Sequence, residues 1–202
     1  MKYFYQTIAI TVIFFGFLLV KADAQTGHDT EWDQRLFDFQ KQGMVALGSW
    51  AAGNFLVSGY QMSRTQEKTY YFHQMNVLWN TVNMGIAVSG YLGAMHSTTG
   101  LPAMEILTEY HRFSKILLVN TGLDVAYMMT GLYLKERSKQ VAKHQHRFAG
   151  YGNSLLLQGG FLFLFDLTLV LLHEQNISEM LSNDAFQLVI SPGYIGVTLQ
   201  FI

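Results

Sequence analysis

The chain contains no cysteine, and charged residues make up only 13% of its 202 residues. Without cysteine there can be no disulfide, no thiolate metal ligand and no cysteine nucleophile. A soluble globular domain carries about 25% charged residues, so the charge content is low for such a domain. The formal net charge of −1 disfavours a nucleic-acid partner, because phosphate binding requires a basic surface.

The common catalytic motifs are also missing from the sequence. It has no Gly-rich phosphate loop, no nucleophile elbow and no His-Glu-x-x-His zinc motif. The Gly150-Tyr151-Gly152 triplet is more typical of a helix start than of a phosphate cradle. The sequence therefore predicts neither a catalytic residue nor a cofactor, and an enzyme is the least favoured class.

The N-terminal residues have the pattern of a secretory signal peptide. Lys2 precedes an apolar run over 7–20, and Ala22-Asp23-Ala24 provides the small residues at which signal peptidase cleaves. We predict a signal peptide over 1–24 and a mature chain that begins at Gln25. The alternative is an uncleaved anchor, which would add a fifth helix; both place the next segment outside the cytoplasm.

The rest of the chain contains four long apolar segments, each without Lys or Arg near its centre. They cover about 43–62, 73–95, 113–134 and 149–173. Each is long enough for a helix that crosses the lipid hydrocarbon, which takes about 20 residues. The predicted fold is an all-α membrane protein: an antiparallel four-helix transmembrane bundle over 43–173, with the lipid bilayer as its surroundings.

Two flanking regions complete the predicted organisation. Residues 25–42 mix charges with aromatic side chains, which favours a periplasmic interfacial segment with a short interfacial helix. The tail over 174–202 is polar and partly helical at first. Its last residues, around Pro192-Gly193, favour an extended segment or hairpin. We expect this tail to pack on the bundle or on a partner, because a lone hairpin has little stability.

Loop charges predict the orientation in the membrane. If the mature chain starts outside, the first and third loops face the cytoplasm; they hold Arg64, Lys68, Lys135, Arg137, Lys139, Lys143 and Arg147. The opposite side holds only Arg35, Lys41, Arg112 and Lys115. An excess of Lys and Arg marks cytoplasmic loops. We therefore predict a multi-pass protein of the bacterial inner membrane with both mature termini periplasmic.

Polar residues recur at helical spacing inside the predicted spans. Asn76, Asn80 and Asn83 share one face of the second span, and Asn120, Asp124 and Tyr127 share one face of the third. Such faces must point inward, since lipid offers polar groups no hydrogen-bond partner. With residues from the other two spans, the predicted intramembrane cluster is Asn54, Asn76, Asn80, Asn83, Asn120, Asp124, Tyr127, Gln158 and Asp166.

Helical rise refines the predicted contacts within this cluster. Antiparallel packing brings Asp166 level with Asn120 and Gln158 level with Asn80, at 1.5 Å per residue. Small residues at four-residue spacing predict two close-packing ridges. One is Ser49 and Gly53, and the other is Gly85, Ser89 and Gly93.

Three histidines are weak candidates for a metal site at the outer surface. His96, His111 and His173 should lie near Glu105, Glu109 and Glu174. Imidazole and carboxylate ligands would suit zinc, but the spacings match no metal-binding signature. An interfacial role for these histidines is the simpler interpretation.

Two segments resemble a family of small, uncharacterised bacterial membrane proteins with a signal peptide and four helices. The segments are Trp79-Asn80-Thr81-Val82-Asn83 and Asn120-Thr121-Gly122-Leu123-Asp124. The resemblance covers most of the mature chain and implies the four-helix fold. It implies no activity.

Two functions from different classes remain open. The first is a structural or assembly protein of the cell envelope, with a protein partner or a second copy of the chain. The second is a small transporter or an ion- or proton-binding protein that uses Asp124 and Asp166, since intramembrane carboxylates are costly and often functional. A water-accessible path to Asp124 would favour the second, and a dry, fully hydrogen-bonded layer would favour the first.

Overall fold

Four long helices form one elongated antiparallel bundle in this computed structural model, which describes residues 31–182, 187–191 and 194–198. The helices are α2 (Glu31–Met62), α3 (Glu67–Met95), α4 (Ala103–Gln140) and α5 (Gln145–Ser182). A short 3-10 helix, η1 (Ala142–His144), joins α4 to α5. The predicted four-helix fold is confirmed for this part of the chain, while the predicted signal peptide lies outside the described residues.

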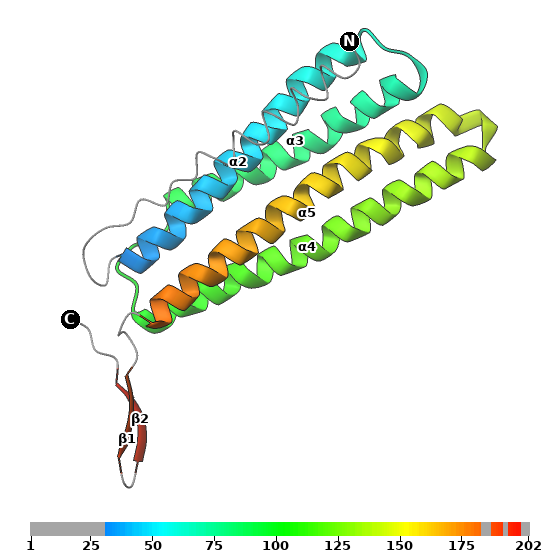
Figure 1. Ribbon diagram of the computed structural model, residues 1–202. Helices are drawn as coiled ribbons and strands as arrows, with labels where there is room; N and C mark the ends of the chain where they lie inside the picture. The colour runs from blue at the N-terminus through cyan, green and yellow to red at the C-terminus, as the bar shows by residue number, and fades with distance from the viewer. Residues whose placement is uncertain (1–30, 183–186, 192–193, 199–202) are drawn as a thin grey trace.

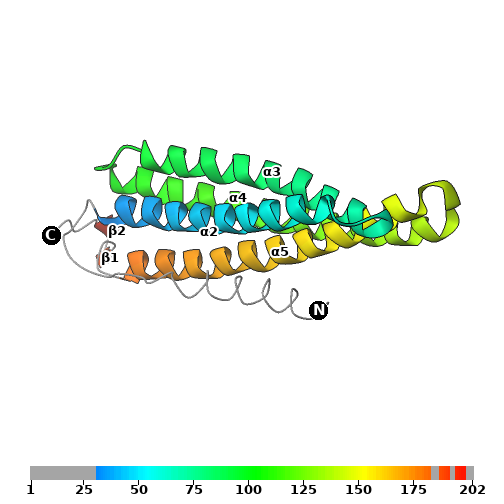
Figure 2. The same ribbon diagram turned by 90° about the horizontal axis from the view of Figure 1, so that it is seen from above.

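The bundle consists of two helical hairpins. The most extensive contacts are α4 with α5 and α2 with α3, and α3 also packs against α5. The α2–α3 and α4–α5 connections lie at one end of the bundle, and the α3–α4 connection lies at the other (Figure 1). The second view shows the helices aligned lengthwise (Figure 2). We call these ends the basic end and the far end, because the first carries most of the Lys and Arg residues.

The helices are longer than the predicted spans, and the largest difference is in α2. This helix runs without a break from Glu31, so the predicted boundary between residues 42 and 43 is not a structural one. Leu36 and Phe37 are buried in a cluster with Tyr110 of α4 and Ile177 of α5. The segment predicted to be interfacial thus belongs to the bundle, because its apolar side chains find partners on three other helices.

Asp33 of α2 binds the α3–α4 connection at the far end of the bundle. Its side chain is fully buried, and its Oδ2 accepts hydrogen bonds from the backbone N–H groups of Gly100 and Leu101. Gly100 has a φ of 80°, a conformation that glycine adopts without the steric cost of a Cβ atom. The carboxylate of α2 therefore fixes the α3–α4 connection.

Close helix approach depends on glycines other than the predicted ones. A Cβ atom on Gly152 of α5 would lie 2.6 Å from the Gly131 carbonyl oxygen of α4, and one on Gly150 would lie 2.5 Å from the Lys68 oxygen of α3. By contrast, a Cβ on Gly53, Gly85 or Gly93 would have no neighbour within 4 Å. The predicted ridges are therefore wrong: small residues at four-residue spacing allow close packing but do not determine which face meets another helix.

The C-terminal tail contains a β-hairpin, as predicted. Strands β1 (Gln187–Ser191) and β2 (Tyr194–Thr198) pair antiparallel, with Ser191 opposite Tyr194. Figure 1 shows the hairpin beyond the end of α5 rather than along a helix of the bundle. Helix α5 also extends into the tail as far as Ser182.

Candidate functional site: two polar regions inside the bundle

The first polar region is a hydrogen-bonded network centred on Asn76 of α3. Its Oδ1 accepts from Ser154 Oγ at 2.5 Å and from Gln158 Nε2 at 3.0 Å, both on α5. Its Nδ2 donates to Ser58 Oγ of α2 at 3.3 Å. The side chains of Asn76, Ser58, Ser154 and Gln158 are all buried. We call this set the amide network.

Further residues extend the amide network along α2. Trp50 Nε1 donates to Gln158 Oε1 at 2.9 Å, and Gln158 Nε2 also reaches Asn54 Oδ1 at 3.4 Å. At the other side, His73 Nδ1 lies 3.2 Å from Ser58 Oγ. The network thus ties α2, α3 and α5 together, and the polar groups of Asn76 and Gln158 are paired on both their oxygen and nitrogen sides.

The second polar region is a pair of carboxyl groups from α4 and α5. Asp124 and Asp166 are 2% and 7% exposed, line the same cavity and are close enough to interact electrostatically. Two ionised carboxylates this close in a buried site repel each other, so the arrangement favours a shared proton or a cation between them. None of the ion pairs in the described chain includes either residue.

Several buried polar atoms beside this carboxyl pair lack partners among the described residues. They are the donors Trp79 Nε1 and Asn83 Nδ2 and the acceptor Asp124 Oδ2. The Trp79 ring packs edge-on against Tyr127, with the centroids 4.6 Å apart. Buried donors and acceptors without partners are rare in folded proteins, because each one costs free energy. This region is therefore built differently from the amide network.

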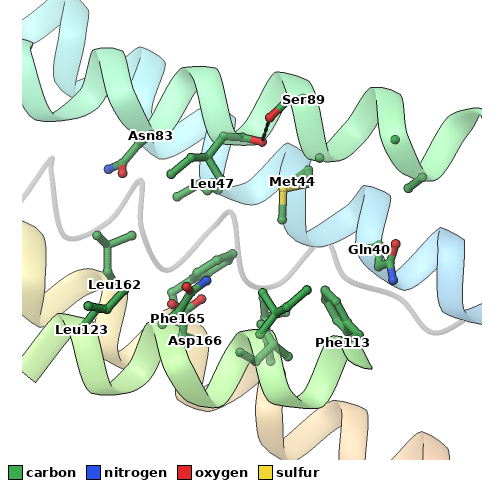
Figure 3. A pocket seen from close by; sticks show the side chains of 18 of the residues that line it. Gln40, Met44, Leu47, Asn83, Ser89, Phe113, Leu123, Leu162, Phe165 and Asp166 are labelled. Atoms are coloured by element: carbon green, nitrogen blue, oxygen red, sulfur yellow. Dashed lines mark hydrogen bonds between the residues drawn. The ribbon is translucent and has the colours of Figure 1, made fainter. Parts of the chain in front are cut away.

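A cavity of about 580 Å³ explains why these atoms have no partner. Asn83 of α3 and Asp166 of α5 point into the same space from opposite sides (Figure 3). Apolar side chains form much of its wall, including Met44, Leu47 and Leu162. The cavity lies between the two hairpins and continues along α3 and α4 to Glu109 and Arg112 at the far end.

The structure places the predicted cluster residues in two groups. Asn54, Asn76 and Gln158 belong to the amide network, whereas Asn83, Asn120, Asp124, Tyr127 and Asp166 line the cavity. Asn80 is buried between the groups, with its Nδ2 donating to the Asn76 carbonyl oxygen. Asn120 is only half-buried.

The predicted pairings across helices are each about one turn off. Asp166 meets Asp124 rather than Asn120, and Gln158 meets Asn76 rather than Asn80. The predicted levels were measured from the midpoint of each apolar segment. The observed helices extend unequally beyond those segments, which shifts the levels at which residues meet.

Trp50, Ser58, Ser154 and Trp79 belong to these polar regions but were not predicted. Trp50, Asn54 and Ser58 follow each other every four residues, as do Ser154 and Gln158. This is the spacing that identified the other polar faces, so the same rule would have found three of the four. Trp79 carries no comparable pattern, because its role depends on the cavity beside it.

His96, His111 and His173, the three histidines considered for a metal site, do not form a metal-binding group in the described part of the chain. His173 is buried, its Nε2 donates to the Tyr110 carbonyl oxygen at 2.9 Å, and its ring stacks between Tyr110 and Phe39. His96 is exposed and lies against the Leu92 carbonyl oxygen. Within the described ranges, no group of three or more His, Asp or Glu side chains is arranged to hold a metal ion.

These features define the class of the protein: an antiparallel four-helix bundle with a polar interior and a carboxyl-lined cavity. The chain belongs to a family of unknown function, DUF6992, whose family model matches residues 46–167. The matched stretch contains both the amide network and the Asp124–Asp166 pair. No curated protein and no solved structure matches the chain.

Proposed function

We propose that the protein is embedded in a membrane and binds a proton or a small cation at the Asp124–Asp166 pair, as a small transporter or ion-binding protein. The observation that carries this proposal is the buried carboxyl pair beside the cavity. A proton shared by two carboxyl groups from different helices is a reversible binding site in the bundle. The unpaired donors of Trp79 and Asn83 in the same cavity support a role beyond packing.

The distribution of side chains supports the membrane location. Polar groups such as Asn80 and Gln158 are fully buried, whereas apolar side chains in the middle of the helices are exposed, including Leu56 at 72%, Val119 at 63% and Leu164 at 64%. A soluble bundle would have the opposite arrangement. Two of the described helices, Met104–Gln140 and Ala142–Met180, are long and apolar enough to cross a membrane.

Charged residues add a second argument for the membrane location. Two long stretches contain no Asp, Glu, Lys or Arg. They are residues 42–63, towards the end of α2, and residues 69–104, which include most of α3 and the loop after it. The stretches 116–134 and 148–173 contain only Asp124 and Asp166. At 1.5 Å per residue, a helix of about 20 residues spans the roughly 30 Å of lipid hydrocarbon. We place the bundle in the bacterial inner membrane, with the basic end cytoplasmic.

A structural or assembly role in the cell envelope is the second candidate function. The amide network favours it, because a closed set of hydrogen bonds between α2, α3 and α5 stabilises the bundle and needs no ligand. The β-hairpin beyond the bundle would then offer a surface for a protein partner (Figure 1).

Two experiments test the proposal at separate steps. Reporter fusions at Lys139 and Ser182 should be in opposite compartments, and the same compartment for both would contradict the membrane topology. In lipid nanodiscs, infrared spectra of the wild type should contain the C=O band of a protonated carboxylic acid at neutral pH. The band should disappear in the Asp124→Asn/Asp166→Asn double variant; if the wild type lacks it, the pair does not hold a proton.

A further inference from the structure

We infer that the cavity between the two hairpins is a binding site for an amphiphilic amino alcohol, whose ammonium group replaces the proton held by Asp124 and Asp166. This inference rests on the proposed function, because it uses the same carboxyl pair. It adds the chemical class of the ligand and the route by which it enters.

The end of the cavity beside Asp124 and Asp166, which we call its deep end, favours an organic cation. Asp124 and Asp166 supply negative charge, and the aromatic side chains Trp79 and Tyr127 line the same cavity, where aromatic rings favour cations over neutral groups. A hard metal ion would need about six oxygen ligands, and the described residues contain no cluster that could provide a metal site. An ammonium group needs only the two carboxyl groups as acceptors.

The unpaired donors at the deep end favour a hydroxyl group next to the ammonium group. Trp79 Nε1 and Asn83 Nδ2 are buried, line the cavity and have no acceptor among the described residues. A hydroxyl oxygen accepts hydrogen bonds from such groups and can donate its own hydrogen to Asp124 Oδ2. An amine without this oxygen would leave both donors unpaired.

The remainder of the cavity favours an apolar chain on the ligand. Its walls beyond the carboxyl pair include Ile86 of α3 and Ile116 and Leu117 of α4. From Asp124 to Arg112 the cavity follows α4 for about 18 Å, at 1.5 Å per residue. The volume of about 580 Å³ is within the range of small-molecule pockets, which are mostly apolar with a few polar groups.

The far end provides the entrance for the ligand. Glu109 and Arg112 line the cavity there and form an ion pair at 3.2 Å. The Arg112 side chain is 69% exposed and the Glu109 side chain is 36% exposed, so the pair lies at the surface. The pairing neutralises the Arg112 charge, so an ammonium ion can pass this point without facing an unpaired cation.

Binding assays with three matched probes test this inference on the whole protein in lipid nanodiscs. The probes are 1-amino-2-octanol, 1,2-octanediol, which replaces the ammonium group with a hydroxyl, and octylamine, which lacks the hydroxyl. Titration calorimetry, corrected with empty nanodiscs, should give the tightest binding for the amino alcohol. The other two should bind about tenfold more weakly or worse, because each loses hydrogen bonds to buried groups.

The exchange for a proton gives a second readout. Amino-alcohol binding should release up to one proton per site, which calorimetry in buffers of different ionisation enthalpy measures. The Asp124→Asn/Asp166→Asn variant should lose both the preference for the amine and the proton release. Equal affinities for amino alcohol and diol, or signals equal to those of empty nanodiscs, would overturn the inference.

Substitutions at the cavity wall test the site in a way that does not depend on the folding of the double variant. Ile116→Trp should reduce amino-alcohol binding about tenfold or more by filling the cavity, while Leu118→Trp, an exposed position on α4 outside the cavity, should not. Equal binding by both variants would contradict the site. If the infrared band of the acid is present but no probe binds, the inference fails while the proton site stands; if the band is absent, the proton site of the proposed function fails.

Discussion

The amide network and the carboxyl pair are both polar and both buried, yet they differ in how their hydrogen bonds are satisfied. Asn76 and Gln158 have partners on other helices, whereas Trp79, Asn83 and Asp124 present unpaired atoms to a cavity. The difference follows from the distance between the hairpins. Near the basic end Gly150 lets α5 approach the α3 backbone, and towards the far end a cavity separates α3 from α4.

This difference separates stability from function within one bundle. A satisfied buried network stabilises a unique packing, and it gains nothing from a ligand. Buried groups without partners reduce stability, and a ligand that pairs with them restores the lost free energy. We therefore expect substitutions in the amide network to act mainly on stability, and those at the carboxyl pair to act mainly on binding.

The largest effect on thermal stability should come from Asn76→Leu. This change removes a partner from Ser58, Ser154 and Gln158 together, and each unpaired buried group costs about 1–3 kcal/mol. Thermal unfolding in detergent should show a midpoint far below that of the wild type. Thr81→Val is a suitable control, since the Thr81 hydroxyl is exposed and bonds only to its own helix. A normal midpoint for Asn76→Leu would show that the network does not hold the helices together.

A smaller but clear loss of thermal stability is expected for Gly152→Ala. The new Cβ atom would lie 2.6 Å from the Gly131 oxygen and 2.8 Å from Lys135 Cγ, so α4 and α5 must move apart. Overpacking of this kind costs about 1–3 kcal/mol of unfolding free energy. The matched control is Gly160→Ala on the same helix, where a Cβ atom would have no neighbour within 4 Å; thermal unfolding of both variants is measured. Equal stability of the two variants would show that α4 and α5 do not depend on this close approach.

At the carboxyl pair, Asp124→Asn should be tolerated better than Asp124→Leu. An amide offers both a donor and an acceptor to Asp166, whereas leucine leaves that carboxyl unpaired. We expect the Asp124→Asn variant to unfold near the wild-type midpoint. The Asp124→Leu variant should lose about 1 kcal/mol of unfolding free energy. This loss is smaller than for Asn76→Leu, because the cavity leaves room for water to pair with Asp166. Both should lose proton binding. A loss for Asp124→Leu as large as that for Asn76→Leu would remove the distinction between the two regions.

The smallest effect is expected for Gly85→Ala, on one of the predicted ridges. Gly85 is exposed, and a Cβ there would contact nothing within 4 Å. Since alanine favours a helix over glycine by about 0.5–1 kcal/mol, the midpoint should stay the same or rise slightly. A marked loss of stability, or a change of oligomeric state in detergent, would mean that this face packs against a second copy of the chain.

The arrangement of helices could be predicted well from the sequence, and the register between them could not. Apolar length identified all four helices, and the helix ends at Met62 and Met95 match the predicted span ends. Spacing of three and four residues identified the inward faces of α3 and α4. The meeting of Asp124 with Asp166 was missed by one turn, because the level of a residue depends on where neighbouring helices begin and how the short η1 connection turns the chain.

What the sequence determined by itself is the pattern along each helix: long apolar stretches, charges near the ends and polar residues on single faces. These follow from local physics, since helical periodicity decides which side chains share a face. Tertiary structure alone decided which glycines meet a backbone, why Asp33 closes the far end, and which polar atoms find partners. Those outcomes depend on the distance between helices far apart in the sequence, and that distance is set by the packing of both hairpins together.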